Sequence, residues 1–262
     1  MKIMTKLFDI ACNFTSERFD SDLDDVISNA IKSNVDKFLV VSAELSDTKK
    51  IQEIKKKYSE NCLITLGVHP HHAKTFNHES VPIMDNQIQD INPNSIGETG
   101  LDFFRNFSSY DEQIYAFNEQ IKLAIKFNKP LFLHQRESHE DFIKVLKNYT
   151  GNLPPCVVHC FTGTQNELDS YLELDFFIGL TGWICDERRN KDLRISIKDI
   201  PLDKLMIETD CPYLIPRNLK TKNNRNEPKH LPHIANEISL LMDIPLDEII
   251  SRTYNNSIRF FS

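Results

Sequence analysis

The 262-residue chain has no apolar run close to the ~20 residues that a membrane-spanning helix needs, which argues against a membrane protein. It contains only 7 Gly and 12 Pro, and neither a low-complexity tract nor a Pro/Ser linker interrupts it. We therefore expect residues 1–262 to form a single domain. Residues 1–6 lack the apolar core and the small-residue cleavage site of a signal peptide, so we expect a cytoplasmic protein.

The six cysteines form no C-x-x-C pair, which favours reduced thiols over disulfides or a zinc ribbon. The closest two, Cys156 and Cys160, flank His159. Side chains alternate between the two faces of a strand, so both cysteines would point to one face and His159 to the other. We expect the cysteines to pack beneath outer helices and His159 to face the interior.

The chain also lacks an excess of positive charge, because its net charge is −7. A dispersed negative field repels phosphate, so a polynucleotide would have to be held locally, by metal ions and a few basic side chains. Residues 216–229 supply such a cluster against a single acidic residue, Glu227. Its basic members are Arg217, Lys220, Lys222, Arg225 and Lys229. We interpret this stretch as a phosphate-contacting loop; the alternative is an ordinary solvated loop.

Apolar runs alternate with amphipathic helical patterns, and 40% hydrophobic residues are enough for a large core. Eight runs predict strands: 6–10, 37–42, 63–68, 95–98, 131–134, 156–159, 176–180 and 204–208. Helical patterns lie between them, which predicts parallel pairing with right-handed crossovers. Eight is the number of strands that closes such a sheet, so the predicted fold class is α/β, a (β/α)8 TIM barrel.

Helices are predicted over 22–33, 138–147, 230–242 and 246–261. The best-marked helix begins at the capping box formed by Ser109 and Glu112 and ends before Pro130. Its apolar face carries Ile114, Phe117, Ile121 and Ile125.

Several predicted strands end in a residue type that binds metals. Glu98, His134 and His159 each end an apolar run. Glu208 ends the eighth run, and Asp210 lies two residues beyond it. Strand ends meet at one face of a barrel, so these side chains should converge and form a metal-dependent hydrolase site. Asp210 could bind the metal and accept a proton from water. Taken singly, each residue has an ordinary alternative: a core hydrogen bond, a salt bridge or a helix cap.

Two further residues are candidate substrate contacts. His69 follows the third strand, and Arg136 lies two residues beyond His134, where it could hold a phosphate with two hydrogen bonds. Aromatic side chains in the loops after the strands could stack on bases, although each taken singly is more often a packing residue. They are Phe14, Phe103, Phe104, Phe161, Trp183 and Tyr213.

At these positions the chain resembles the TatD family of metal-dependent deoxyribonucleases. The similar segments occur in order over nearly the whole chain. They are residues 8–10, 67–71, 96–102, 134–136, 159–163, 182–189, 208–214 and 225–232.

The resemblance implies an amidohydrolase-type TIM barrel with 3′–5′ exonuclease activity on single-stranded DNA and RNA, and a link to DNA repair. It also implies metal ligation by Glu98, His134, His159 and Asp210, with Asp210 as the proton acceptor. Magnesium is the implied cofactor, while histidine ligation would also suit manganese or zinc. The substrate would be a 3′ end, bound by His69, Arg136 and Arg225, and we expect a monomer.

The chain departs from the wider family at the first strand, where a His-x-His pair is replaced by Ala11 and Asn13. We therefore expect one well-held ion. A second ion would be weak and completed by Asp9, Glu208, Asp210 or substrate phosphate. Asn13 would be a weak neutral ligand, and Asp9, Asn13 and Glu208 could instead support the first ion's ligands.

The sequence leaves two alternative functions to weigh, a hydrolase of another bond and a non-catalytic binding protein. The same metal and proton acceptor could hydrolyse another ester, as in a D-aminoacyl-tRNA deacylase. A small-molecule amidohydrolase is disfavoured by the missing His-x-His pair. A non-catalytic nucleic-acid-binding barrel is disfavoured by the acidic net charge and by the ligand set at the strand ends.

Overall fold

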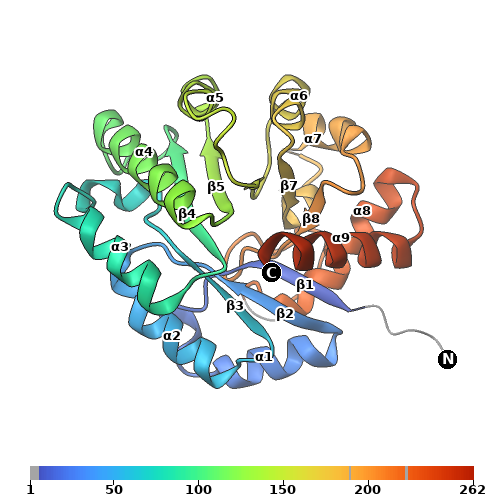
Figure 1. Cartoon of the computed structure of the whole chain (residues 1–262). Helices are drawn as coiled ribbons and strands as arrows, with labels where there is room; N and C mark the ends of the chain where they lie inside the picture. Colours follow the sequence, from blue (N-terminus) through green and yellow to red (C-terminus); the bar gives the residue numbers. More distant parts are fainter. Residues whose placement is uncertain (1–5, 189, 222–223) are drawn as a thin grey trace.

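Eight strands stand in chain order around a ring, and helices cover its outer side in the computed structural model (Figure 1). The structure describes residues 6–188, 190–221 and 224–262, so Lys222 of the basic loop lies outside the described residues. The strands are β1 (Leu7–Cys12), β2 (Val35–Val40), β3 (Cys62–Leu66), β4 (Ser95–Asp102), β5 (Leu131–Arg136), β6 (Cys156–Val158), β7 (Phe177–Leu180) and β8 (Leu205–Ile207).

Each strand pairs in parallel with the next, from β1 to β8. The ring closes where Cys12, at the end of β1, forms a parallel bridge with Cys211, just after β8. The predicted (β/α)8 barrel is therefore confirmed, and all eight expected strands are present.

The helices that cover the barrel are α1 (Leu23–Lys32), α2 (Thr48–Lys57), α3 (Ser80–Ile91), α4 (Tyr110–Phe127), α5 (His139–Lys147), α6 (Gln165–Glu173), α7 (Lys191–Ser196), α8 (Leu231–Met242) and α9 (Leu246–Phe261). The predicted capping box opens α4: Ser109 Oγ accepts from the backbone N–H of Glu112, whose carboxylate accepts from the N–H of Ser109. Phe117 and Ile121 of the predicted stripe are fully buried against the barrel.

Two strands run further than the sequence suggested. β4 continues four residues past Glu98 and β5 two residues past His134, so these two side chains lie within strands rather than at their ends. The extension depends on glycine, because the two backbones approach closely. A Cβ on Gly100, whose φ is +146°, would lie 1.9 Å from the carbonyl oxygen of His134.

An apolar plug fills the barrel at the amino-terminal ends of the strands. The last turn of α9 turns Phe261 into the interior, where its ring centroid lies 5.9 Å from that of Phe8 and 6.5 Å from that of Phe132. Figure 1 shows α9 lying across this end. Glu98, His134 and His159 lie toward the opposite end, where the carboxyl-terminal ends of the strands form the mouth of the barrel.

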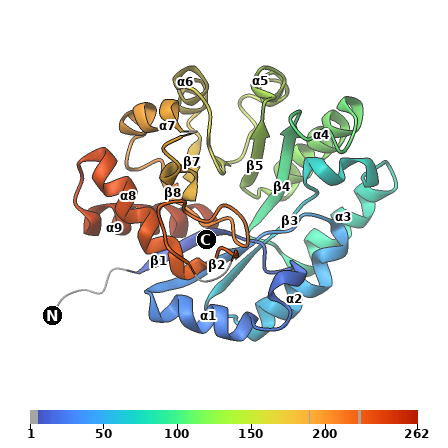
Figure 2. The ribbon, with the colours of Figure 1, turned by 180° about the vertical axis from the view of Figure 1, so that it is seen from behind.

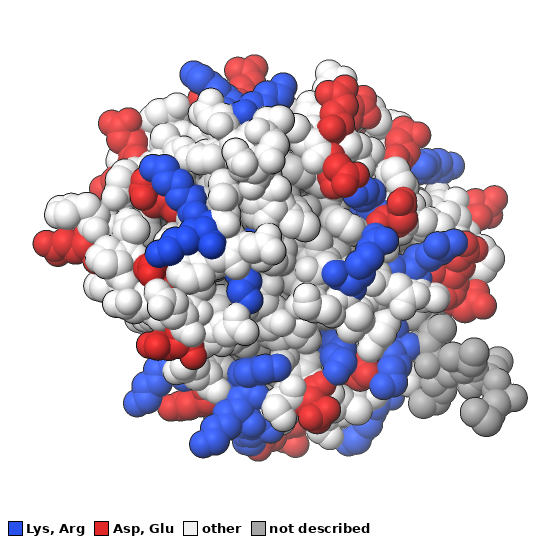
Figure 3. All heavy atoms as spheres, viewed as in Figure 1, with Lys and Arg blue, Asp and Glu red and all other residues white. Residues whose placement is uncertain are grey.

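On the face that carries α9, the described basic and acidic side chains are interspersed (Figure 3). Within the described ranges, no helix has both the length and the apolar character that crossing a bilayer requires.

Candidate active site

One carboxylate oxygen at the mouth of the barrel is surrounded by three imidazoles from three different segments. Glu98 Oε1 lies 2.8 Å from Nδ1 of His134 and 2.7 Å from Nε2 of His159. It also lies 3.1 Å from Nε2 of His69, which follows β3. The strand-borne residues predicted as metal ligands therefore converge as expected.

Each of the two strand histidines has a second carboxylate next to its other ring nitrogen. His134 turns its other ring nitrogen, Nε2, toward Asp102 Oδ2 at 3.3 Å, and His159 turns Nδ1 toward Glu208 Oε2 at 3.6 Å. Carboxylates placed in this way orient metal-binding imidazoles and raise their basicity. Glu208 is fully buried, and its other oxygen accepts from the N–H of Cys160, so it faces His159 rather than open space.

Asp102 is a site residue that the sequence reasoning missed. It occupies the last position of β4, four residues after Glu98, and residues separated by an even number share one face of a strand. That spacing was the available signal, but the strand was expected to end at Glu98. Asp102 Oδ2 also lies 2.8 Å from Nε2 of His71, which joins that loop histidine to the network.

His69 is held as a neutral hydrogen-bond donor. Its Nδ1 accepts from the backbone N–H of His71, so the ring proton is on Nε2 and points at Glu98. Burial lowers the pKa of His69 to about 4, which keeps the ring uncharged near neutral pH. The geometry therefore favours a role for His69 in orienting Glu98, rather than the substrate contact that the sequence suggested.

The arrangement of donors suits a divalent ion. Nδ1 of His134 and Nε2 of His159 are 3.4 Å apart and face the same carboxylate oxygen. Two nitrogens bound to one tetrahedral ion at the usual length would be separated by about 3.3 Å. His159 Nδ1 and Glu208 Oε2 are buried and have no hydrogen-bond partner among the described residues.

The pKa values of Glu98 and His159 also favour a site for a divalent ion. Burial alone would raise the pKa of Glu98, but the charge of His159 and the hydrogen bond from His134 outweigh it and hold that pKa well below its usual range. Burial opposes protonation of His159, but the charges of Glu98 and Glu208 raise its pKa well above normal. The site thus stabilises a positive charge beside Glu98, and a proton supplies that charge when no cation is bound.

Asp210 lies beside this cluster and titrates near neutral pH. Burial raises the pKa of Asp210 to about 7, and the negative charges of Glu98 and Glu208 add to the rise. Its Oδ1 accepts a 2.9 Å hydrogen bond from Nδ2 of Asn13. The same nitrogen donates to the carbonyl oxygen of Cys211 at 3.1 Å, so the amide group of Asn13 presents its N–H2 side to the site.

Two of the residues predicted to complete a second metal site, Asp9 and Asn13, are engaged in hydrogen bonds within the protein. Asp9 is fully buried and accepts from the backbone N–H groups of Ala11 and Thr209 and from the hydroxyl of Thr209. Asn13 presents donors, which cannot bind a cation. The structure therefore favours supporting roles for Asp9 and Asn13 over ligation.

A cavity of about 440 Å³ opens from the cluster at the mouth of the barrel. His134 and His159 line it, together with Phe104, Arg105, Arg136 and Trp183 among others. Nη1 of Arg136 donates to the hydroxyl of Thr162 at 3.0 Å, and this hydrogen bond helps to fix the side chain. Seen from the side opposite to that of Figure 1, the loop after β8 crosses in front of the strands (Figure 2).

Arg225 does not share this cavity. Its guanidinium forms two hydrogen bonds with Asp22, at 2.8 and 2.7 Å, and a third with Glu227 at 2.9 Å, while it lies over the ring of Phe19. These contacts tie the loop after β8 to the start of α1. The geometry therefore favours a structural role for Arg225 over the phosphate contact expected from the sequence.

The six loop aromatics differ in exposure, and Phe103 and Trp183 are half-buried. Phe14 and Phe161 are buried and unavailable to a ligand, whereas Phe104 and Tyr213 are each 53% exposed. Cys160 is also placed differently from the expectation. The chain turns at this residue, with φ +47°, so strand alternation stops at Val158 and Cys160 lines the cavity instead of packing beneath a helix.

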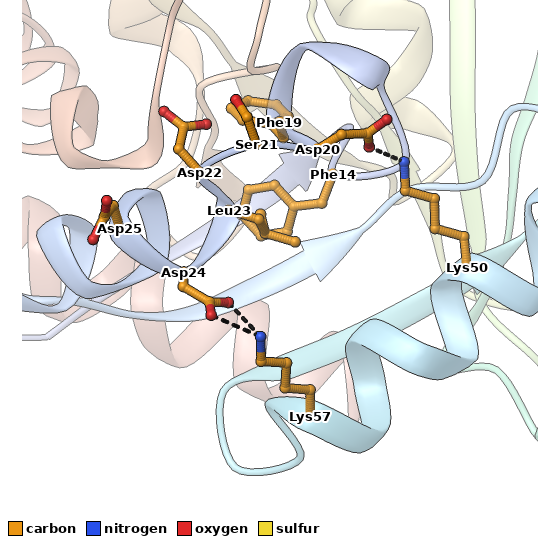
Figure 4. Close-up of a pocket in the computed structure, with 10 residues that line it drawn as sticks. All are labelled: Phe14, Phe19, Asp20, Ser21, Asp22, Leu23, Asp24, Asp25, Lys50 and Lys57. Atoms are coloured by element: carbon orange, nitrogen blue, oxygen red, sulfur yellow. Dashed lines mark hydrogen bonds and ion pairs between the residues drawn. The ribbon is translucent and has the colours of Figure 1, made fainter.

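A separate hollow lies at the start of α1 and includes none of the clustered histidines (Figure 4). Its acidic side chains are partly neutralised, because Asp20 pairs with Lys50 and Asp24 pairs with Lys57. It lacks the convergent imidazoles of the mouth, so we place the chemistry at the mouth.

Comparisons with known proteins agree with this fold. The family described as "TatD related DNase" matches residues 8–262. A protein of Erwinia tasmaniensis named 3′-5′ ssDNA/RNA exonuclease TatD is 42% identical over 258 residues, which cover 98% of this chain and 100% of that protein. The structure of a TatD family hydrolase from Entamoeba histolytica superposes with a TM-score of 0.90 at 29% identity, covering 98% of this chain and 99% of the other. A TatD homolog from Escherichia coli gives 0.91 at 26% identity over 98% of each chain.

Proposed function

Because the chain belongs to the family of TatD-related DNases, we propose that it is a divalent-metal-dependent 3′–5′ exonuclease of single-stranded DNA and RNA. The observation that supports this most directly is the convergence of three imidazole nitrogens on one oxygen of Glu98. The substrate and the 3′–5′ direction of cleavage are proposed from the names of the relatives. The residues of the site are suited to metal-dependent hydrolysis of such a substrate.

Glu98, His134, His159 and Asp210 are the residues that would hold the ion. Magnesium is the expected working cofactor, and the imidazoles would also suit manganese or zinc. When bound, a divalent ion lowers the pKa of a coordinated water and stabilises negative charge on a phosphate.

The side chains around the ion have distinct tasks in hydrolysis. Asp210 accepts the proton of the attacking water, for which a carboxyl group with a pKa of about 7 is well suited. Asn13 holds Asp210 in position, and His69 does the same for Glu98. Arg136 faces the cavity and would neutralise a phosphate of the strand.

We further propose that the protein acts as a cytoplasmic monomer built from one domain. The six cysteines are free, as expected in a reducing compartment. One eight-stranded barrel carries the cluster and the cavity, which supports a single domain.

A 5′-labelled single-stranded DNA oligonucleotide tests the proposed function. With magnesium or manganese, the expected result is a ladder of products that shorten from the 3′ end, and with EDTA no products. Internal cuts would contradict the exonuclease assignment. Absence of cleavage with every metal, together with hydrolysis of aminoacyl-RNA, would favour an ester hydrolase instead.

Metal binding should release protons. His159 carries a raised pKa, so a proton must leave the site before the ring can bind an ion. Affinity should therefore fall as the pH falls, with at least one proton released per ion near pH 7. Calorimetric titration in two buffers of different ionisation enthalpy measures this number. Equal heats in both buffers would contradict the assignment of His159 as a ligand.

The Asn13→Ala variant should lose activity without losing the metal. Its amide fixes Asp210, and loss of such a supporting group costs about 10- to 100-fold in activity. We expect kcat to fall in that range at saturating metal, while the melting temperature stays near that of the unaltered protein. An unchanged kcat would show that Asp210 does not depend on Asn13.

A further inference from the structure

The cavity beside the histidine cluster contains two guanidinium groups without a carboxylate partner. Among the described residues, Arg188, Arg194 and Arg225 each pair with an acidic side chain. Arg105 and Arg136 form no such pair within the described ranges, and unlike the similarly unpaired Arg18, Arg252 and Arg259 they line this cavity. In a chain with a net charge of −7, cations left unpaired beside a deep pocket are suited to an anionic ligand.

An aromatic surface accompanies these charges. The guanidinium carbon of Arg136 lies 5.2 Å from the ring centroid of Phe104 and 5.7 Å from that of Trp183. The guanidinium carbon of Arg105 lies 5.6 Å from the ring of Phe104. Phe104 is 53% exposed, so much of this ring remains free to stack on a planar ligand.

Phe104 is exposed but its backbone is fixed. Asp102 Oδ1 accepts from the backbone N–H of Phe104 at 3.0 Å and from that of Arg105 at 2.8 Å. The other oxygen of Asp102 faces His134 and His71. One carboxylate thus connects the candidate metal centre to the segment that carries the ring, which sets the distance between the two before a ligand arrives.

We propose that Phe104, Arg105 and Arg136 form a subsite for one nucleotide next to the scissile bond. Phe104 stacks on its base, and the two guanidiniums bind its phosphate. The pocket has the volume of a small-ligand site, about 440 Å³, and shares His134 and His159 with the cluster. The inference rests on the proposed nuclease function and adds to it a dependence on the base at one position.

An abasic scan tests the subsite. The substrates are 5′-labelled single strands with one abasic residue at the first, second or third position from the 3′ end, digested by the metal-loaded full-length protein. In the unaltered protein, one of these positions should raise KM about tenfold, which is the loss expected for one stacked base. In Phe104→Ala, KM on the normal strand should rise by a similar factor, and the abasic residue at that position should have no further effect.

Two further variants separate stacking from general damage. Phe104→Trp keeps an aromatic face and should restore KM. Tyr115→Ala removes an exposed aromatic side chain of α4 that does not line the cavity, and should behave like the unaltered protein. If Phe104→Ala keeps the normal KM, or if its abasic penalty equals that of the unaltered protein, the subsite is wrong. If the unaltered protein fails to shorten the normal strand, the proposed function itself fails.

Discussion

Replacing Glu98 with Gln is expected to reduce kcat/KM by at least about 10³-fold, since a metal ion contributes several kcal/mol to stabilisation of the transition state. The substitution keeps the shape of the side chain and removes its charge. His134 and His159 would then face an amide where they now share a carboxylate oxygen at 2.8 and 2.7 Å. The site could no longer stabilise the positive charge that the carboxylate attracts.

The fold should survive this change. Glu98 lies above the apolar plug formed by Phe8, Phe132 and Phe261, so the packing of the interior does not depend on its charge. Circular dichroism and thermal melting check the fold, and initial rates on labelled single-stranded DNA check activity. Glu173→Gln, an exposed carboxylate in α6, is the matched control. Near-normal activity of Glu98→Gln would show that the cluster is not the catalytic centre.

Asp210→Asn should lower kcat by about 10²- to 10⁴-fold, the usual contribution of a general base. The asparagine keeps an oxygen that can accept from Asn13, so the local structure should be preserved. The loss should fall on kcat much more than on KM. Asp90→Asn, at an exposed position of α3, is the matched control. A variant with kcat within a few-fold of normal would exclude Asp210 as the proton acceptor.

The pH profile gives this prediction a second measurement. Only ionised Asp210 can accept a proton, so kcat should rise as the pH increases through the pKa of this group. That pKa is about 7 without a cation, and a bound divalent ion lowers it, so the rise should be centred below about 7. In Asp210→Asn this acidic limb should disappear. An unchanged limb would assign it to another group.

The strands and their order were predictable because each apolar run is bounded by helical patterns. The hydrophobic pattern gave too short a length for two strands, β4 and β5. Glu98 and His134 read as strand ends, since polar residues follow them, yet β4 and β5 continue to Asp102 and Arg136. The continuation depends on close backbone contact at Gly97 and Gly100, a tertiary effect that hydrophobic periodicity does not report.

The sequence also did not reveal which residues pair with the charged and polar side chains. Arg225 lies in a basic stretch, but its carboxylate partner Asp22 is 203 residues away in the chain. Asn13 was read as a weak ligand from its position in the first strand. The structure turns its amide N–H2 toward Asp210, on the other side of the barrel closure. Such pairings follow from the closed barrel and become visible only when distant segments are placed together.

Calorimetric titration of the metal-free protein with Mn²⁺, beside the same titration of Glu98→Gln, tests the metal centre most directly. We predict one tightly bound ion per chain in the unaltered protein and loss of that binding in the variant. Two equally tight ions per chain, or one ion bound with unchanged affinity by Glu98→Gln, would contradict a single centre held by Glu98, His134 and His159.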